Sequence, residues 1–202
     1  MIARFASTAL AALALASTST PALAQAETPT ITEETFSSVI FTAFCLATEG
    51  NIAVGKERAR GLTTAESPGA LELNDADRAS LIGESATDAW LFFRPEEQPP
   101  VFLSYAKTES GADVCQVLTL GSLTDLGPVF GGVLDQHEAL TSHTITEAGD
   151  ASFLENPDMT GNSYLVSMSA LNAFVVLIEE RDETITDDEA IMKMVAFYIP
   201  SE

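Results

Sequence analysis

Short apolar runs separated by turn residues recur along the chain after residue 88. The first three runs cover residues 89–93, 101–107 and 113–120. The turn-rich segments RPEEQPP and TESGA separate them. Such spacing is typical of antiparallel strands joined by hairpin loops. Four further strand-like runs cover residues 151–155, 163–169, 173–180 and 191–199. We therefore expect an antiparallel sheet of about six to seven strands.

The last of these runs carries two conflicting patterns. Thr186 and Glu189 form a capping box, which would start a helix. Large side chains at every second position from Ile191 to Ile199 favour a strand instead. We expect the strand, and a helix over 187–199 stays the alternative.

Three segments have helical features. Residues 33–48 repeat apolar side chains at helical spacing, and residues 52–60 predict a second helix that ends before Gly61. Gly127 and Pro128 predict the start of a third helix, because proline is favoured in a first helical turn.

The segment between the second helix and the strands, residues 62–87, is polar and turn-rich. We expect a surface excursion there, with one or two helical turns after Asn74. The order helix, strands, helix, strands predicts an α+β domain with two to four helices packed on one face of the sheet. A pair of related halves, each a helix plus three strands, is an alternative within this class.

The first 26 residues have the order of a secretory signal peptide. Arg4 precedes an apolar core at residues 9–16, and small residues follow. Cleavage after Ala24 and cleavage after Ala26 are both open. The apolar core is about half of the roughly 20 residues that span a bilayer, so we expect cleavage rather than an anchor.

The expected product of cleavage is one exported domain, residues 27–202, located in the periplasm or outside the cell. No cysteine follows either cleavage site, where a lipid would be attached. The longest later apolar run, residues 173–178, is much too short to span a bilayer. We therefore expect no stable membrane insertion after the leader is removed.

The exported chain is strongly acidic. All 30 Asp and Glu residues follow the leader, as do eight of the nine Lys and Arg residues, which gives a net charge of −22. This charge disfavours nucleic acid and anionic membranes as partners. A solvated or salt-adapted surface is the favoured explanation, and an acidic face for a cationic protein, peptide or Ca²⁺ is the alternative.

Cys45 and Cys115 are the only two cysteines of the chain. Cys45 falls in the last turns of an apolar helix, where the helix dipole disfavours a reactive thiolate. An oxidising compartment outside the cytoplasm favours pairing the two thiols. We predict a Cys45–Cys115 disulfide, with two buried free thiols as the alternative.

No metal or cofactor is expected. His137 and His143 are six residues apart and would not share a face of a continuous helix, so we expect two surface histidines. Neither the histidines nor the cysteines have the close spacing of zinc ligands. The acidic segments 74–77 and 182–189 do not match a calcium-binding EF-hand loop, and turn and capping chemistry explains them.

The chain contains no recognisable catalytic constellation. Ser104 and Lys107 match the Ser-x-x-Lys pattern of penicillin-recognising enzymes, but on a strand they would face opposite ways. Elbow, phosphate-loop, dinucleotide-binding and His-Glu-x-x-His motifs are absent from the sequence. Trp90 is expected in the core rather than in a ligand site.

One cluster of cations is a candidate ligand site. Lys56, Arg58 and Arg60 hold three of the eight cations of the exported chain, and arginine binds carboxylates and phosphates in two-point fashion. The favoured explanation is structural, because cations suit the C-terminal end of a helix.

These features predict an exported, non-enzymatic domain that binds a protein or a component of the cell envelope. The most specific version of this hypothesis is an acidic inhibitor of a cationic enzyme. One alternative is an envelope enzyme with a dispersed acidic site built from residues such as Asp75, Asp77 or Glu84. Another is a small-molecule or lipid-binding domain that uses the interior of the sheet. The oligomeric state is left open.

Overall fold

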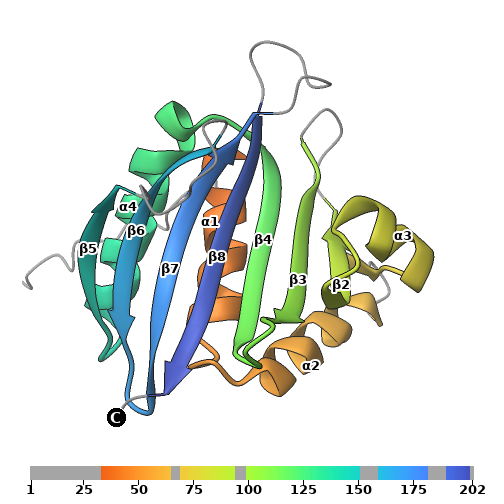
Figure 1. Cartoon of the computed structure of the whole chain (residues 1–202), viewed down its shortest axis with the longest axis horizontal. Coiled ribbons are helices and arrows are strands. Elements are labelled where there is room, and N and C mark those ends of the chain that lie inside the picture. The colour runs from red at the N-terminus through yellow and green to blue at the C-terminus, as the bar shows by residue number, and fades with distance from the viewer. Residues whose placement is uncertain (1–32, 65–68, 94–98, 151–158, 182–189, 201–202) are drawn as a thin grey trace, which may run out of the picture. The chain divides into compact units, whose positions relative to one another are not determined.

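Eight antiparallel strands form one sheet in the computed structural model, which describes residues 33–64, 69–93, 99–150, 159–181 and 190–200 (Figure 1). The strands are β1 (Ala70–Glu72), β2 (Ala86–Phe92), β3 (Val101–Lys107), β4 (Asp113–Gly121), β5 (Thr144–Asp150), β6 (Met159–Ser167), β7 (Leu171–Glu180) and β8 (Ala190–Pro200). Their order across the sheet is β1-β2-β3-β4-β8-β7-β6-β5. The α+β class is confirmed, and the strand count exceeds the predicted six to seven.

The two strands that the sequence pattern missed, β1 and β5, are the edges of the sheet. β1 has only three residues, too few to show alternation. β5 has the sequence TITEAGD, in which Ile145 is the only large apolar side chain. An edge strand with one exposed side needs few apolar residues, which explains the missing signal. The strand predicted over 191–199 is confirmed as β8, whereas the run at 151–155 lies outside the described residues.

The helices are α1 (Glu33–Phe41), a π-helix η1 (Thr42–Leu46), α2 (Ile52–Thr63), α3 (Asp75–Leu81) and α4 (Leu123–Leu140). The first predicted helix is thus an α-helix whose last turn widens into a π-helix. For the other two helices, the predicted end of the second and the predicted start of the third were wrong. α2 continues through Gly61, and α4 starts earlier because Ser122 caps it by accepting the Asp125 N–H. Pro128 therefore lies inside α4.

Two halves of the domain have the same connectivity. α1 precedes β1 to β4, and α4 precedes β5 to β8. In each half the strands run in order from an edge of the sheet to its centre, where β4 pairs with β8 (Figure 1). The halves thus share one helix followed by four strands, not the helix plus three strands considered above, and the first half adds η1 and α2 before β1 and α3 between β1 and β2.

The main core lies between the sheet and the helices. In Figure 1, α1 and α4 both lie behind the sheet. Their rings meet where Phe41 of α1 contacts Phe130 of α4 edge-on, with centroids 5.5 Å apart. Trp90, Val117 and Met194 project from β2, β4 and β8 into the same cluster. This side of the sheet is the core side.

A second, smaller apolar cluster lies on the other side of the sheet. Its buried members are Val114, Val176, Ile178 and Val195, each between 0 and 8% exposed. The register places Val176 of β7 beside Val195 of β8. No residue of a described helix belongs to this cluster. We call this side the open face; it consists of the strand residues that alternate with those on the core side.

Candidate functional site

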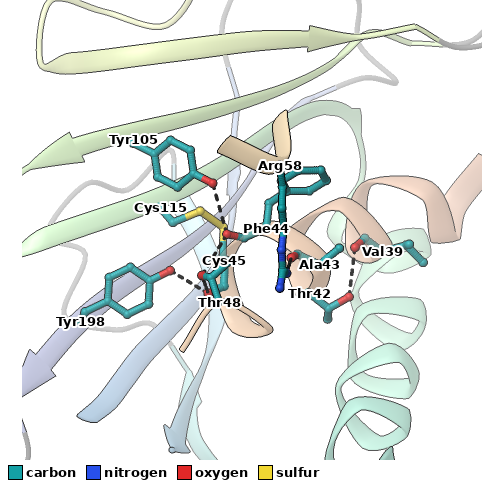
Figure 2. Close-up of a disulfide and its surroundings, with 10 residues drawn as sticks. All are labelled: Val39, Thr42, Ala43, Phe44, Cys45, Thr48, Arg58, Tyr105, Cys115 and Tyr198. Atoms are coloured by element: carbon teal, nitrogen blue, oxygen red, sulfur yellow. Dashed lines mark hydrogen bonds between the residues drawn. A yellow bond between two sulfur atoms is a disulfide. The ribbon is translucent and has the colours of Figure 1, made fainter. Parts of the chain in front are cut away.

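Cys45 of η1 and Cys115 of β4 form a disulfide, as predicted (Figure 2). Their Cα atoms are 5.6 Å apart, and both residues are 0% exposed. No thiolate can approach a sulfur that is sealed from solvent, so this bond is suited to holding the helix on the sheet rather than to redox exchange.

Side chains from the sheet complete the hydrogen bonding of η1. The hydroxyl of Tyr198 donates to the carbonyl of Cys45 at 2.9 Å, and that of Tyr105 donates to the carbonyl of Phe44 at 3.2 Å (Figure 2). Burial is the main cause that raises the pKa of both phenols, so both hydroxyls remain protonated donors at neutral pH. Carbonyls at the end of a helix have no partner within it. The two tyrosines therefore anchor the helix end.

The three cations predicted as a ligand site are held by groups of the protein itself. Lys56 pairs with Asp88, and Arg60 approaches the same carboxylate at 3.4 Å. Arg58 points elsewhere and donates to the carbonyl of Ala43 at 3.1 Å (Figure 2). Binding of an external anion by these residues stays a prediction, since an anion would have to compete with Asp88.

The charge of Asp88 is stabilised by this arrangement. Burial by itself would raise the pKa of the carboxyl, but hydrogen bonds from Lys56 and Thr87, with the charges of Lys56 and Arg60, lower it below its ordinary value. Arg60 also approaches Glu72 of β1 at 3.6 Å. The cations of α2 thus attach this helix to β1 and β2.

The two histidines are not the surface residues that were predicted. His143 is 6% exposed, and its Nδ1 lies 2.9 Å from Nε2 of His137. The prediction assumed a continuous helix, but α4 ends at Leu140 and the chain turns back before β5. Desolvation and then the neighbouring His143 lower the pKa of His137, so the His137 ring is neutral at pH 7.

Among the described residues, no third ligand completes a metal site at this histidine pair. The nearest carboxylate, Glu49, lies 3.9 Å from His143 on the ring nitrogen that does not face His137. Within the described part of the chain, no three His, Cys, Asp or Glu side chains gather as a metal ion would require. The pair links α4 to the start of β5.

The acidic residues considered for a dispersed catalytic site lie on open surface. Asp75 and Asp77 belong to the exposed helix α3, where Asp75 pairs with Arg78 at 2.8 Å and Asp77 accepts from Asn74 at 2.6 Å. Glu84 follows this helix and is exposed. These contacts are the capping chemistry that the sequence indicated. They form no pocket with converging carboxylates.

Two hollows lie at one end of the sheet. The larger has a volume of about 470 Å³ and is lined by Tyr198, Leu171 and the loop around Gly111. The smaller, about 340 Å³, is lined by Lys56, Tyr105 and neighbouring residues. Both are open and partly polar, whereas a lipid or drug-sized ligand is usually buried in a mostly apolar cavity.

The open face carries a concentration of exposed apolar side chains. Of the seven large hydrophobic residues exposed in the described part of the chain, Leu71, Leu165 and Ile199 lie on this face, at 50, 40 and 48% exposed. Phe93, 48% exposed, continues the alternation of β2 on the same side. Leu91, Phe102 and Phe197 lie between them and are half-buried.

Charge is nearly absent from the open face. The register of the described strands places only Lys193 and Glu180 there, and these two pair with each other. Glu72, Asp88 and Asp113 project to the core side instead. A chain of formal net charge −21 therefore has one largely apolar surface on which the described strands carry no net charge.

Sequence reasoning missed the open face, although one signal was present. Residues 173–178, AFVVLI, form a continuous apolar run within β7. A strand with one solvent-exposed side alternates apolar and polar residues, whereas a continuous apolar run indicates that both sides are covered.

Ser104 lies on the open face and Lys107 on the core side, so the Ser-x-x-Lys match is a coincidence of sequence.

Comparison with known proteins gives no match: no protein-family model fits the chain, and no curated protein or solved structure resembles it significantly. Among the described helices, none has the length and hydropathy needed to cross a bilayer. Function must therefore be inferred from the surfaces of the molecule. The open face is the candidate functional site.

Proposed function

We propose that this chain is an exported, non-enzymatic binding domain that docks a protein partner on the open face of its sheet. The observation that carries the proposal is the apolar surface without net charge around Val176 and Val195, to which no described helix contributes. Export rests on the predicted signal peptide, residues 1–26, which lies outside the described residues.

The composition of the open face is that of the centre of a protein interface. Interface centres are depleted of charged residues and enriched in aromatic and large apolar ones. Soluble proteins rarely expose contiguous apolar patches larger than a few hundred Å² without a binding role. Phe93, Phe102 and Phe197 each offer a rigid ring that would gain from being removed from water.

Photo-crosslinking in the producing cells tests this proposal. A photoreactive phenylalanine analogue is placed at Leu165 or Ile199 on the open face. Matched controls carry it at Leu81 on α3 or Leu140 on α4, which are 55 and 78% exposed but lie off the sheet. We expect covalent protein adducts from the open-face positions and far fewer from the controls.

The proposal fails if irradiation gives no protein adduct from either open-face position. It also fails if Leu81 and Leu140 give adducts as readily, because the contact would then be non-specific. The mass of the adduct identifies the partner without any assumption about it.

A further inference from the structure

We infer that the partner on the open face is a second copy of this chain, bound face to face as a two-sheet sandwich. This inference rests on the proposed function, since it names the partner of the same surface. Three properties of the open face support a second copy: its area, its distribution of apolar side chains and its lack of net charge.

The area of the sheet matches what a stable dimer requires. Eight strands, spaced about 4.8 Å apart with about 3.4 Å per residue, give the sheet a projected area on the order of 1,000 Å². A standard protein interface buries about 800 Å² on each partner. Full contact between two open faces would therefore reach the size of a specific interface.

The apolar side chains are distributed so that the face is complementary to itself. Leu71 and Phe93 lie in the first half of the domain, and Leu165 and Ile199 lie in the second. Because the two halves have the same connectivity, apolar surface occurs on both sides of the central β4–β8 pair. A twofold rotation would therefore bring apolar side chains of the first half opposite apolar side chains of the second half on both sides of the axis.

The packing of two such sheets follows a common geometry. Sheets stack face to face about 10 Å apart, with side chains of the two inner faces interdigitated. The buried cluster of Val114, Val176, Ile178 and Val195 would then become the centre of the dimer interface. Lys193 and Glu180 already neutralise each other within one copy, so no unpaired charge on the described strands would be buried.

Charge gives the dimer a distinctive dependence on salt. Two chains of net charge −22 repel each other at a distance, and the attraction between their open faces is apolar. Screening by salt weakens the repulsion and leaves the attraction intact. The dimer should therefore become tighter with salt, whereas a complex with a cationic partner would become weaker.

Sedimentation equilibrium of the exported chain tests the inference. We expect twice the monomer mass at concentrations between about 1 and 100 µM, with tighter association as NaCl rises from about 0.05 to about 0.5 M. The variants Leu165→Glu and Ile199→Glu place a charge on the open face and should raise the dimer dissociation constant about tenfold or more. Leu81→Glu and Leu140→Glu add the same charge elsewhere and should change the constant by less than about twofold.

Three results would overturn the inference. They are a monomer at every concentration and salt, a dimer that Leu165→Glu and Ile199→Glu leave intact, and association that weakens with salt. Circular dichroism of each variant verifies that the fold is retained. If the chain is monomeric but photo-crosslinks to another protein from Leu165, the second-copy inference is wrong and the proposed binding function stands.

Discussion

Cys45 attaches the first helix of the chain to the sheet through both its side chain and its backbone. The sulfur is bonded to Cys115 of β4, and the carbonyl accepts the hydroxyl of Tyr198 of β8. The same carbonyl accepts the hydroxyl of Thr48 at 3.0 Å. β4 and β8 are the two central strands, so these contacts fix the helix end over the middle of the sheet.

Removal of the disulfide should strongly destabilise the domain. The bond closes a loop with a sequence separation of 70 residues, and restriction of the unfolded chain by a loop of this length contributes about 4 kcal/mol. We expect the double variant Cys45→Ala/Cys115→Ala to lose about this much free energy of unfolding, measured by urea denaturation. A loss of less than about 1 kcal/mol in the free energy of unfolding would contradict the assignment of the Cys45–Cys115 disulfide as a stabilising cross-link.

His137 should make the free energy of unfolding depend on pH near neutrality. The pKa of His137 is lower in the folded protein than in the unfolded chain, so the unfolded chain takes up a proton first as the pH falls. The contribution of neutral His137 to the free energy of unfolding is therefore complete above about pH 6.5 and is lost as the pH falls below that value.

Comparison of wild type with His137→Gln measures this contribution. Between about pH 7 and 5.5 the free energy of unfolding of the wild type should fall more steeply than that of the variant. Glu49, Glu138 and other carboxylates near the pair are common to both proteins, so they largely cancel in the difference. Identical slopes would contradict the lowered pKa.

At the scale of elements, one glycine decides how closely α2 approaches the sheet. A side chain on Gly55 would collide with the hydroxyl of Tyr105 and would lie 3.0 Å from the carbonyl of Phe44. Gly61 of the same helix has no neighbour within 4 Å of the corresponding position. The absence of a side chain at Gly55 thus lets α2 pack directly on the tyrosine that anchors η1.

Alanine at these two glycines should have opposite effects. Gly55→Ala should destabilise the domain by about 1–3 kcal/mol, because it forces α2 away from Tyr105. Gly61→Ala should stabilise it by about 0.5–1 kcal/mol through the better helix propensity of alanine. Urea denaturation measures both, and a stabilising Gly55→Ala would show that the approach is looser than described.

The sequence predicted those elements whose own residues carry the pattern. β3 and β4 were placed almost to the residue, because alternation in VFLSYAK and DVCQVLTL is bounded by clear turn residues. β1 and β5 were missed because each is held in the sheet mainly by backbone hydrogen bonds to one neighbouring strand, and these leave no apolar pattern in the sequence. The start of α4 was placed too late because Pro128 was assigned to the first turn, whereas the helix begins after the cap at Ser122.

Contacts between distant residues were predicted only where the chain offered a single choice. Cys115 was the one available partner for Cys45, so composition alone was sufficient. The pairing of Lys56 and Arg60 with Asp88 depends on how α2 lies against β2, which no local pattern encodes. The open face depends on which side of each strand the helices cover, and that is settled by the topology of the whole sheet.

At the scale of the whole molecule, one core connects the two halves. Phe130 of α4 contacts Phe41 of the first half with centroids 5.5 Å apart and Tyr164 of the second half at 5.8 Å. The side chain of Phe130 is 0% exposed. Because the halves share this contact and the β4–β8 pair, we expect the domain to unfold as one unit.

Phe130→Ala tests this cooperativity. Loss of the buried ring should cost about 3–5 kcal/mol, and the fluorescence of Trp90, the only tryptophan, should report the same shift as circular dichroism. Leu140→Ala, at the exposed end of the same helix, should change stability by less than about 0.5 kcal/mol. If the unfolding transition followed by Trp90 fluorescence differs from the one followed by circular dichroism, the halves unfold independently.

The position of β8 at the centre of the sheet has a consequence for how the chain is made. Ribosomes and export channels deliver a chain from its N-terminus, so residues 190–200 emerge after all the other strands. Until then β4 and β7 each present an unpaired edge in the middle of the future sheet, and the core side lacks Met192, Met194 and Tyr198. Partial chains would be prone to aggregate through these two edges. The domain therefore completes its sheet only once residues 190–200 have emerged, and a chaperone that shields the partial sheet would have to act before then.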